Sequence, residues 1–346
     1  MKILLIGATG FIGPFVVREL VRQGHETAVF HRGNAKPDLP DRVQQIFGDR
    51  QQLGDHGEEF RRFAPEVIVD CILSSGRQAR AAMQTFRGLA QRVVALSSGD
   101  VYRACGILNG TETGALQPVP LTEDSELRRS GNVYPPETLH MLRGVFPWLD
   151  EEYDKIPVER AVMGDPELPG TVLRLPMVYG PGDPLHRLFP YIKRMDEDRP
   201  AILLQEDAAR WRGPRGFVEN VAAAVALAAV SELAAGRIFN VTEQPAVSEK
   251  EWVERIGEVV GWPGKVLPIP KDATPAHIRV PYNCEQDWAM SSDRIRAELG
   301  YAEPVDQRAA LERTIAWERA HPPQFAPQQF DYAAEDEAIE IQSRRR

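Results

Sequence analysis

The chain has 346 residues, 43% of them hydrophobic and 26% charged, a composition typical of a soluble globular protein with one large or two smaller domains. Its net charge of −9 argues against a nucleic-acid partner, and its most apolar helical run, residues 221–230, is too short to span a bilayer. The three cysteines, Cys71, Cys105 and Cys284, form no CxxC pair, so we expect buried thiols in a reduced, cytoplasmic protein without a bound metal.

The first predicted element is a short apolar strand, residues 3–6, which ends at a glycine-rich turn and is followed by a helical pattern. Gly7 allows a tight turn, Gly10 lets the backbone approach a pyrophosphate, and Gly13 lets the helix pack against the sheet. The pyrophosphate then lies at a helix N-terminus, where free N–H groups favour an anion. This arrangement predicts a dinucleotide-binding fold, and the alternative is a glycine-rich turn that binds no ligand.

A second strand over residues 26–30 ends at His31 and Arg32. NAD-binding folds usually place an acidic residue near this strand end, where it bonds the ribose 2′-hydroxyl. A cation there suits a 2′-phosphate instead, so the sequence favours NADP over NAD. Alternatively, Arg32 stacks on the adenine or points to solvent.

The next strands alternate with helices and predict a doubly wound parallel sheet. Residues 42–47 form a third strand, after which Asp49 either accepts from the adenine amino group or caps the following helix. A fourth strand over residues 66–71 and a fifth over 92–96 flank a helix over residues 76–90.

Polar residues follow the fifth strand, where ligands bind in such sheets: Ser97, Ser98 and Asp100 are candidates for chemistry, against the alternative of a serine-rich turn. Residues 103–147 hold no clear strand and are typical of a substrate loop. A helix is expected over residues 149–162, with Asp150 as its N-cap.

The rest of the chain predicts a sixth strand, further helices and a tail. The strand spans residues 171–175 and runs into 176–182; the later elements are a buried helix ending near residue 230, a strand at 237–241, and helices at 248–261, 293–300 and 307–320. We expect a Rossmann domain of residues 1–178 plus 214–244, an interleaved, smaller substrate-binding region of 179–213 plus 245–321, and a flexible tail of 322–346 whose last dozen residues have no predicted regular structure.

These motifs together resemble the extended short-chain dehydrogenase/reductases, the NAD(P)-dependent epimerase/dehydratase group, from residue 2 to about residue 320. The glycine turn at residues 7–13 is similar to the family's cofactor motif, and the segment 97–102 looks like its catalytic serine strand end, with Ser98 in the Ser/Thr position. Segments 174–182, 215–221 and 291–301 resemble its later motifs. The resemblance implies a hydride-transfer enzyme that works with NAD or NADP.

One part of the family pattern fails. The family places a tyrosine acid/base four residues before a lysine, with a glutamate four residues beyond it; here Lys155 and Glu159 fit, but Glu151 stands where the tyrosine belongs. The resemblance therefore makes Ser98, Asp100, Glu151 and Lys155 the candidate catalytic residues. Glu151 could equally be a solvated residue of a first helical turn. Tyr102, Tyr134 and Tyr153 are further candidates for the missing group.

The cofactor-binding residues expected from the turn, the strand ends and the resemblance are Gly7, Thr9, Gly10, Phe11, Ile12, Gly13, His31, Arg32, Asp49, Arg50, Cys71, Lys155, Pro176 and Val178. Three functions remain open: an epimerase or dehydratase acting on a sugar nucleotide or related substrate, an NADPH-dependent carbonyl reductase, and a cofactor-binding protein without catalysis. Arg187, Lys193, Arg210, Trp211 and Arg212 could hold a diphosphate or stack a base. A homodimer is an expectation from the resemblance alone.

Overall fold

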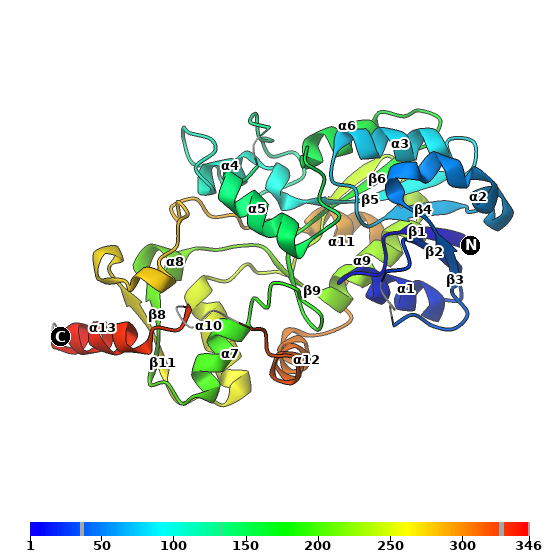
Figure 1. The fold of residues 1–346 in the computed structure, drawn as a ribbon. Helices are drawn as coiled ribbons and strands as arrows, with labels where there is room; N and C mark the ends of the chain where they lie inside the picture. Colours follow the sequence, from blue (N-terminus) through cyan, green and yellow to red (C-terminus); the bar gives the residue numbers. More distant parts are fainter. Residues whose placement is uncertain (35–37, 132, 325–328, 345–346) are drawn as a thin grey trace.

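The computed structural model describes residues 1–34, 38–131, 133–324 and 329–344, and its centre is a seven-stranded parallel sheet (Figure 1). The strand order is β10–β6–β5–β4–β1–β2–β3. The strands are β1 (Lys2–Ile6), β2 (Glu26–His31), β3 (Gln44–Phe47), β4 (Val67–Asp70), β5 (Arg92–Ser98), β6 (Gly170–Leu175) and β10 (Arg237–Asn240). The chain winds from β1 to one edge and then returns to build the other half from β4, so a crevice is expected where the two halves meet. The predicted doubly wound sheet is confirmed.

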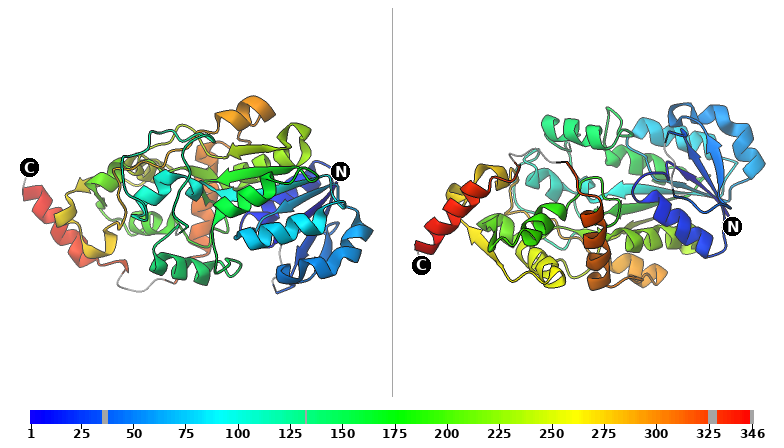
Figure 2. Two further views of the ribbon diagram at one scale, coloured as in Figure 1. Left: turned by 90° about the horizontal axis from the view of Figure 1, so that it is seen from above. Right: turned by 60° about the horizontal axis from the view of Figure 1, so that its bottom comes forward.

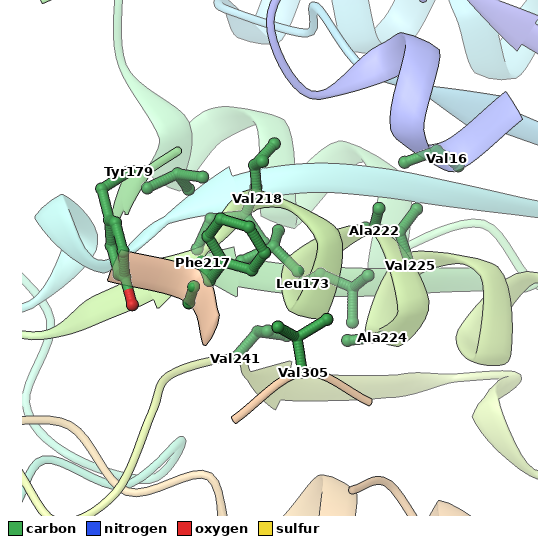
Figure 3. Close-up of a cluster of buried hydrophobic side chains, with 14 of the residues drawn as sticks. Val16, Leu173, Tyr179, Phe217, Val218, Ala222, Ala224, Val225, Val241 and Val305 are labelled. Atoms are coloured by element: carbon green, nitrogen blue, oxygen red, sulfur yellow. The ribbon is translucent and has the colours of Figure 1, made fainter. Parts of the chain in front are cut away.

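Helices cover both faces of this sheet. On one face lie α1 (Gly13–Arg22) and α9 (Val218–Val230); on the other lie α2 (Gly57–Phe63), α3 (Gly76–Phe86) and α6 (Lys155–Met163) (Figures 1 and 2). Figure 3 shows Val218 and Val225 of α9 beside Leu173 of β6 and Val16 of α1. Because both faces are covered, the inner strands β1 and β4 are almost wholly apolar, as the sequence indicated.

A smaller part of the molecule carries two short parallel sheets. β7 (Met177–Tyr179) pairs with β9 (Arg215–Phe217), and β8 (Ala201–Gln205) pairs with β11 (Lys265–Ile269). The helices of this part and of the connections are α4 (Arg103–Leu108), α5 (Pro136–Val145), α7 (Phe189–Asp196), α8 (Glu206–Arg210), α10 (Glu249–Val260), α11 (Asp293–Leu299), α12 (Gln307–Ala320) and α13 (Tyr332–Arg344). The 3-10 segments are η1 (Arg50–His56), η2 (Gly99–Val101), η3 (Glu232–Ala234), η4 (Lys271–Ala273) and η5 (Ala276–Ile278). The predicted helices near residues 250, 295 and 314 are confirmed, whereas no pattern in the sequence predicted β7, β9 or β11.

The helix expected over residues 149–162 begins later than predicted. Asp154, not Asp150, is its N-cap, and the Asp154 carboxylate accepts a hydrogen bond from the Ile156 N–H at 3.0 Å. This start places Pro157 in the first turn, where its missing N–H costs no helical hydrogen bond. The expected loop of residues 103–147 is only partly irregular, because it contains α4 and α5. α5 begins at Pro136, and proline is common at the first position of a helix.

The tail, expected to be flexible and to lack regular structure at its end, forms α13 instead. Its Glu335 is completely buried and pairs with Arg194 of α7 and with His277 at 2.9 Å. Long-range ion pairing of a buried carboxylate therefore orders a segment whose polar composition alone suggested disorder. Residues 325–328, 345 and 346 of this tail lie outside the described residues.

Candidate active site

The glycine turn after β1 has the geometry expected of a dinucleotide site. Gly7 adopts a φ of 72°, and a Cβ at Gly13 would lie 2.3 Å from the Ala8 Cα, so any side chain there would displace the backbone. In contrast, a Cβ at Gly10 would meet no described atom within 4 Å. The N-cap of α1, Ile12, provides no side-chain hydrogen bond. Pro14 has no N–H and the Phe15 N–H donates to the Ile12 carbonyl, so the Gly13 N–H is the first-turn donor of α1 that is available to an anion.

A cavity of about 840 Å³ opens at this turn and runs along the carboxyl ends of the central strands. Every residue that the sequence indicated for the cofactor lines it, and so do Ser98 and Glu151; Asp100 lies behind its wall. The volume falls within the range of small-molecule and cofactor sites. Segments far apart in the sequence thus meet around one space.

The cavity end beside β2 presents an exposed cation next to a buried histidine. His31 is buried, and its Nδ1 accepts from the Gly33 N–H at 3.2 Å, so its Nε2 donates to Gln45 Oε1 at 3.1 Å. Arg32 is exposed and makes no ion pair with the residues that the structure describes. His31 therefore holds the turn in place, whereas the Arg32 guanidinium is available to a ligand.

The neighbouring strand ends supply a buried ion pair that the sequence analysis missed. Arg50 donates two hydrogen bonds of 2.7 Å to the carboxylate of Asp70, which is completely buried at the end of β4. The Arg50 Nε is also buried and has no partner among the described residues. Asp49 caps η1 by accepting from the Gln51 N–H, as one of its two interpretations predicted. An acidic residue at the end of an apolar strand was the available signal for Asp70.

Lys155, the first residue of α6, lines the cavity. Its Nζ donates to the backbone carbonyl of Leu73, which follows β4. It also donates to the carbonyl of Leu96, near the end of β5, at 2.9 Å. An ammonium group has three N–H donors, so one remains for a ligand. Burial lowers the pKa of Lys155 to about 8, although the nearby Asp100 and Asp70 oppose that effect.

Ser98 and its neighbour Ser97 have different surroundings. Ser98 lines the cavity, and its Oγ accepts from the Asp100 N–H at 3.2 Å. The Ser97 hydroxyl donates to Glu159 at 2.6 Å, and Glu159 forms a buried, two-pronged ion pair with Arg174. Tyr102 belongs to this second network, because its hydroxyl donates to Asn240 and accepts from Arg174. Ser98 is thus the serine available to a substrate, and Tyr102 has a structural role.

Asp100 lies behind the cavity wall and contacts two tyrosines that line the cavity. Its Oδ2 accepts from the Tyr153 hydroxyl at 2.7 Å and from the Tyr134 hydroxyl at 3.2 Å. Its Oδ1 is buried without a partner among the described residues. Burial raises the pKa of Asp100, and Arg128 partly opposes this. Burial and the Asp100 charge hold the pKa of Tyr153 well above its ordinary value.

Glu151 is exposed and precedes α6, so it does not lie one helical turn before Lys155. It belongs to a wall segment, residues 134–153, that closes one side of the cavity. This wall segment is attached to the start of α3, because the Asp150 carboxylate accepts from Ser75 at 3.1 Å and from Arg77 at 2.7 Å. The Asp150 N–H also donates to Ser74 at 2.8 Å.

Of the five residues considered for a diphosphate or base, Arg187 lines the cavity and the other four do not. Arg187 pairs with Asp183 at 2.6 Å and donates to the Val178 carbonyl. Lys193 instead pairs with Glu197, and Trp211 donates to the Gln286 carbonyl at 3.0 Å.

The described residues can be compared with the requirements of a metal-ligand cluster and of a membrane-spanning helix. No cluster of His, Cys, Asp and Glu side chains among them is arranged to hold a metal ion. Within the same residues, no helix combines the length and apolar character needed to cross a membrane.

Comparisons with known proteins agree with this fold. A curated relative, 2'-dehydrokanamycin reductase of Streptomyces kanamyceticus, is 23% identical over 279 residues, or 79% of this chain and 70% of the relative. A UDP-glucose 4-epimerase of Thermus thermophilus in complex with NAD shares the fold at 20% identity and a TM-score of 0.60, covering 93% of this chain and 100% of that chain.

A second solved structure is a UDP-glucuronic acid 4-epimerase of Bacillus cereus in complex with UDP-glucuronic acid and NAD. Its identity is 16% and its TM-score 0.63, over 92% of this chain and 99% of that chain. Residues 3–94, which contain the glycine turn and the first four strands, match the model of the NAD dependent epimerase/dehydratase family. Residues 3–94 are therefore similar to the NAD dependent epimerase/dehydratase family, and the whole chain shares the fold of the solved epimerases.

Proposed function

We propose that the protein is an NAD(P)-dependent enzyme of the epimerase/dehydratase type, which acts on a hydroxyl- or carbonyl-bearing carbon of a sugar nucleotide or a related substrate. One observation carries the proposal: the glycine turn, Lys155 and Ser98 line the same cavity. The nicotinamide supplies the acceptor and donor of a hydride when it is bound. Ser98 is placed to hydrogen-bond the substrate oxygen, and Lys155 to donate to a bound ligand.

The residues at the glycine turn fit a dinucleotide. The Gly10 backbone borders open space, where a ligand can approach it without meeting a side chain, and the Gly13 N–H at the start of α1 suits a pyrophosphate. The Nε of Arg50, which has no partner among the described residues, is a further donor at the same end of the cavity. We assign Glu151 no proton transfer, because it is exposed and outside α6.

The nucleotide released by denaturing the purified protein tests this proposal. Stoichiometric NAD or NADP would indicate that the cofactor is recycled within each turnover, as an epimerase or dehydratase requires. A protein that carries no nucleotide and binds neither NAD nor NADP would contradict the proposal. Expression of a Gly13→Val variant in parallel gives the matched control, since this side chain would overlap the turn.

The second candidate is an NADPH-dependent carbonyl reductase, and Arg32 favours it. An exchangeable NADPH needs a site that recognises the 2′-phosphate, which the exposed Arg32 guanidinium can provide. The relative named as a reductase also supports this candidate. A protein that is purified without nucleotide and then prefers NADPH to NADH would favour the reductase.

Replacing Arg32 with alanine is expected to weaken NADP binding about 10- to 100-fold and to leave NAD binding nearly unchanged, because one charge-assisted contact is lost. Isothermal titration of the variant and the wild type with each nucleotide measures this. Arg18→Ala is a control for the loss of one exposed charge, since Arg18 pairs with Asp38 on the surface of α1. Equal losses for the two nucleotides would contradict a role in 2′-phosphate recognition.

A third possibility is a cofactor-binding protein without catalysis, which the missing family tyrosine first suggested. Nucleotide binding without turnover of any hydroxyl or carbonyl substrate would favour it. The homodimer and the cytoplasmic location expected from the sequence stay predictions.

A further inference from the structure

Asp100 is completely buried, yet one of its oxygens has no partner among the described residues. Its neighbours that carry charge or titrate are Arg128, Lys155, Tyr134, Tyr153 and Cys105. Arg128 is itself fully buried and donates to the backbone carbonyl of Asp100 and to Asp154. The Asp100 carboxylate is therefore held in a fixed position among buried polar groups. Its side chain takes part in neither the Glu159–Arg174 ion pair nor the Arg50–Asp70 ion pair.

Tyr153 connects this carboxylate to the cavity. Its hydroxyl donates to Asp100 Oδ2 at 2.7 Å, while its side chain is half-buried and lines the cavity. The Lys155 Nζ lies 6.0 Å from the centre of the Tyr153 ring. Because the phenol O–H already points to Asp100, the lone pairs of its oxygen are left to accept a proton from a ligand.

We propose that Tyr153 and Asp100 form a two-step proton relay that replaces the acid/base tyrosine of the family. In substrate oxidation, a substrate hydroxyl gives its proton to the Tyr153 oxygen while Tyr153 passes its own proton to Asp100 Oδ2. The C–H electron pair leaves as hydride to the oxidised nicotinamide, so the alcohol becomes a carbonyl and Asp100 becomes a neutral acid. Reduction reverses each transfer, and no free tyrosinate forms in either direction.

The surroundings of the two groups suit such a relay. Burial and the Asp100 charge raise the pKa of Tyr153 and keep it protonated, which disfavours a tyrosinate as base. Burial makes Asp100 a stronger proton acceptor than an exposed carboxylate. Asp100 also lies behind the cavity wall, so a proton stored there during the carbonyl stage is shielded from solvent. This inference rests on the proposed function, because it needs a hydride acceptor in the same cavity.

Tyr134 is the rival for this role and also the matched control. It contacts the same Asp100 oxygen, but at 3.2 Å, and its ring lies nearly parallel to that of Tyr153 with centroids 6.4 Å apart. Tyr153 has the shorter hydrogen bond and stands two residues from Lys155. We therefore assign the transfer to Tyr153 and the positioning of Asp100 to Tyr134.

The test compares wild type, Tyr153→Phe, Tyr134→Phe and Asp100→Asn, loaded with NAD or NADP. UDP-glucose and UDP-glucuronic acid are the probes for oxidation and epimerisation, and 2,3-butanedione with NADPH is the probe for reduction. Tyr153→Phe is expected to lower kcat about 100- to 10,000-fold with KM changed less than about 3-fold, as for loss of a general acid/base. Tyr134→Phe should retain kcat within about 10-fold of wild type, because a positioning contact contributes less than the acid/base itself. Asp100→Asn should lower kcat and abolish the acid limb of its pH profile for oxidation.

A second readout needs no turnover. In protein labelled with ¹³C at the tyrosine Cζ, the Tyr153 resonance is identified by its absence from Tyr153→Phe. It should shift as Asp100 titrates, and this step should vanish in Asp100→Asn. Nucleotide affinity that is equal in all four proteins would show that the variants fold and load normally.

The outcomes separate the two proposals. Turnover by wild type together with retained turnover by Tyr153→Phe would overturn the relay and leave the proposed function intact. Loss of activity in Tyr134→Phe alone would overturn the assignment to Tyr153. A wild type that binds nucleotide but turns over none of the three probes would count against the proposed function for these substrates. In that case the Tyr153 resonance decides the relay: a resonance that does not shift as Asp100 titrates would overturn it, and one that does would support it.

Discussion

Replacing Lys155 with methionine is expected to weaken nicotinamide nucleotide binding about 10- to 100-fold, because one charge-assisted hydrogen bond contributes about 1.5–3 kcal/mol. The wild-type Nζ has two backbone carbonyls as partners and one N–H left for the ligand. Isothermal titration with NADP and NAD measures the loss. Lys155→Arg, which keeps the charge, is the control, and a methionine variant that binds as tightly as wild type would show that Lys155 does not contact the nucleotide.

The same residue predicts how nucleotide binding depends on pH. Because burial lowers the pKa of Lys155 to about 8, the free protein loses this charge as the pH rises above that value. Binding that requires the ammonium must then take up a proton, so wild-type affinity should fall as the pH rises from about 7 to about 9.5, on either side of that pKa. Lys155→Met should show a flat profile over this range. An affinity that rises with pH in wild type would have the opposite sign and contradict this account.

Replacing Glu159 with leucine is expected to destabilise the fold by about 3–5 kcal/mol, because it leaves a buried guanidinium without its carboxylate. The Arg174 and Glu159 side chains are 2% and 5% exposed and share two hydrogen bonds of 2.8 and 3.0 Å. Ser97 would lose its acceptor as well. The shift in the midpoint of urea unfolding, followed by circular dichroism, measures the effect.

The double variant Glu159→Leu/Arg174→Met is the matched control for this prediction. Removing both charges also removes the unpaired guanidinium, so the double variant should be more stable than Glu159→Leu alone. Losses that simply add would indicate that the two side chains do not depend on one another.

Much of the nucleotide-binding half could be predicted because its signals are local. The apolar run before Gly7, the three glycines and the alternating strands and helices each depend on a few neighbouring residues, and all are confirmed as elements of the fold. The residues indicated at the strand ends also line one cavity, since parallel strands end at the same edge of a sheet.

The rest depends on contacts between distant residues. The family motif places its tyrosine one helical turn before the lysine, which in this sequence is the position of Glu151. Because Asp154 caps α6 and the helix begins at Lys155, Glu151 lies outside the helix and that spacing does not apply. The bond between Tyr153 and Asp100 joins residues 53 positions apart, and the pair between Arg194 and Glu335 joins residues 141 apart. No periodicity within a short window reports such pairs.

The attachment of the wall segment to α3 has a consequence for how the site opens. Tyr134 and Tyr153 stand at the two ends of this segment, and Asp150, which fastens it, lies three residues before Tyr153. Asp100 is outside this segment, in η2 directly after β5. An outward movement of the wall segment that widens the cavity would therefore separate the Tyr153 hydroxyl from the Asp100 carboxylate. The proposed proton relay would then work only while the wall segment is closed over the bound substrate.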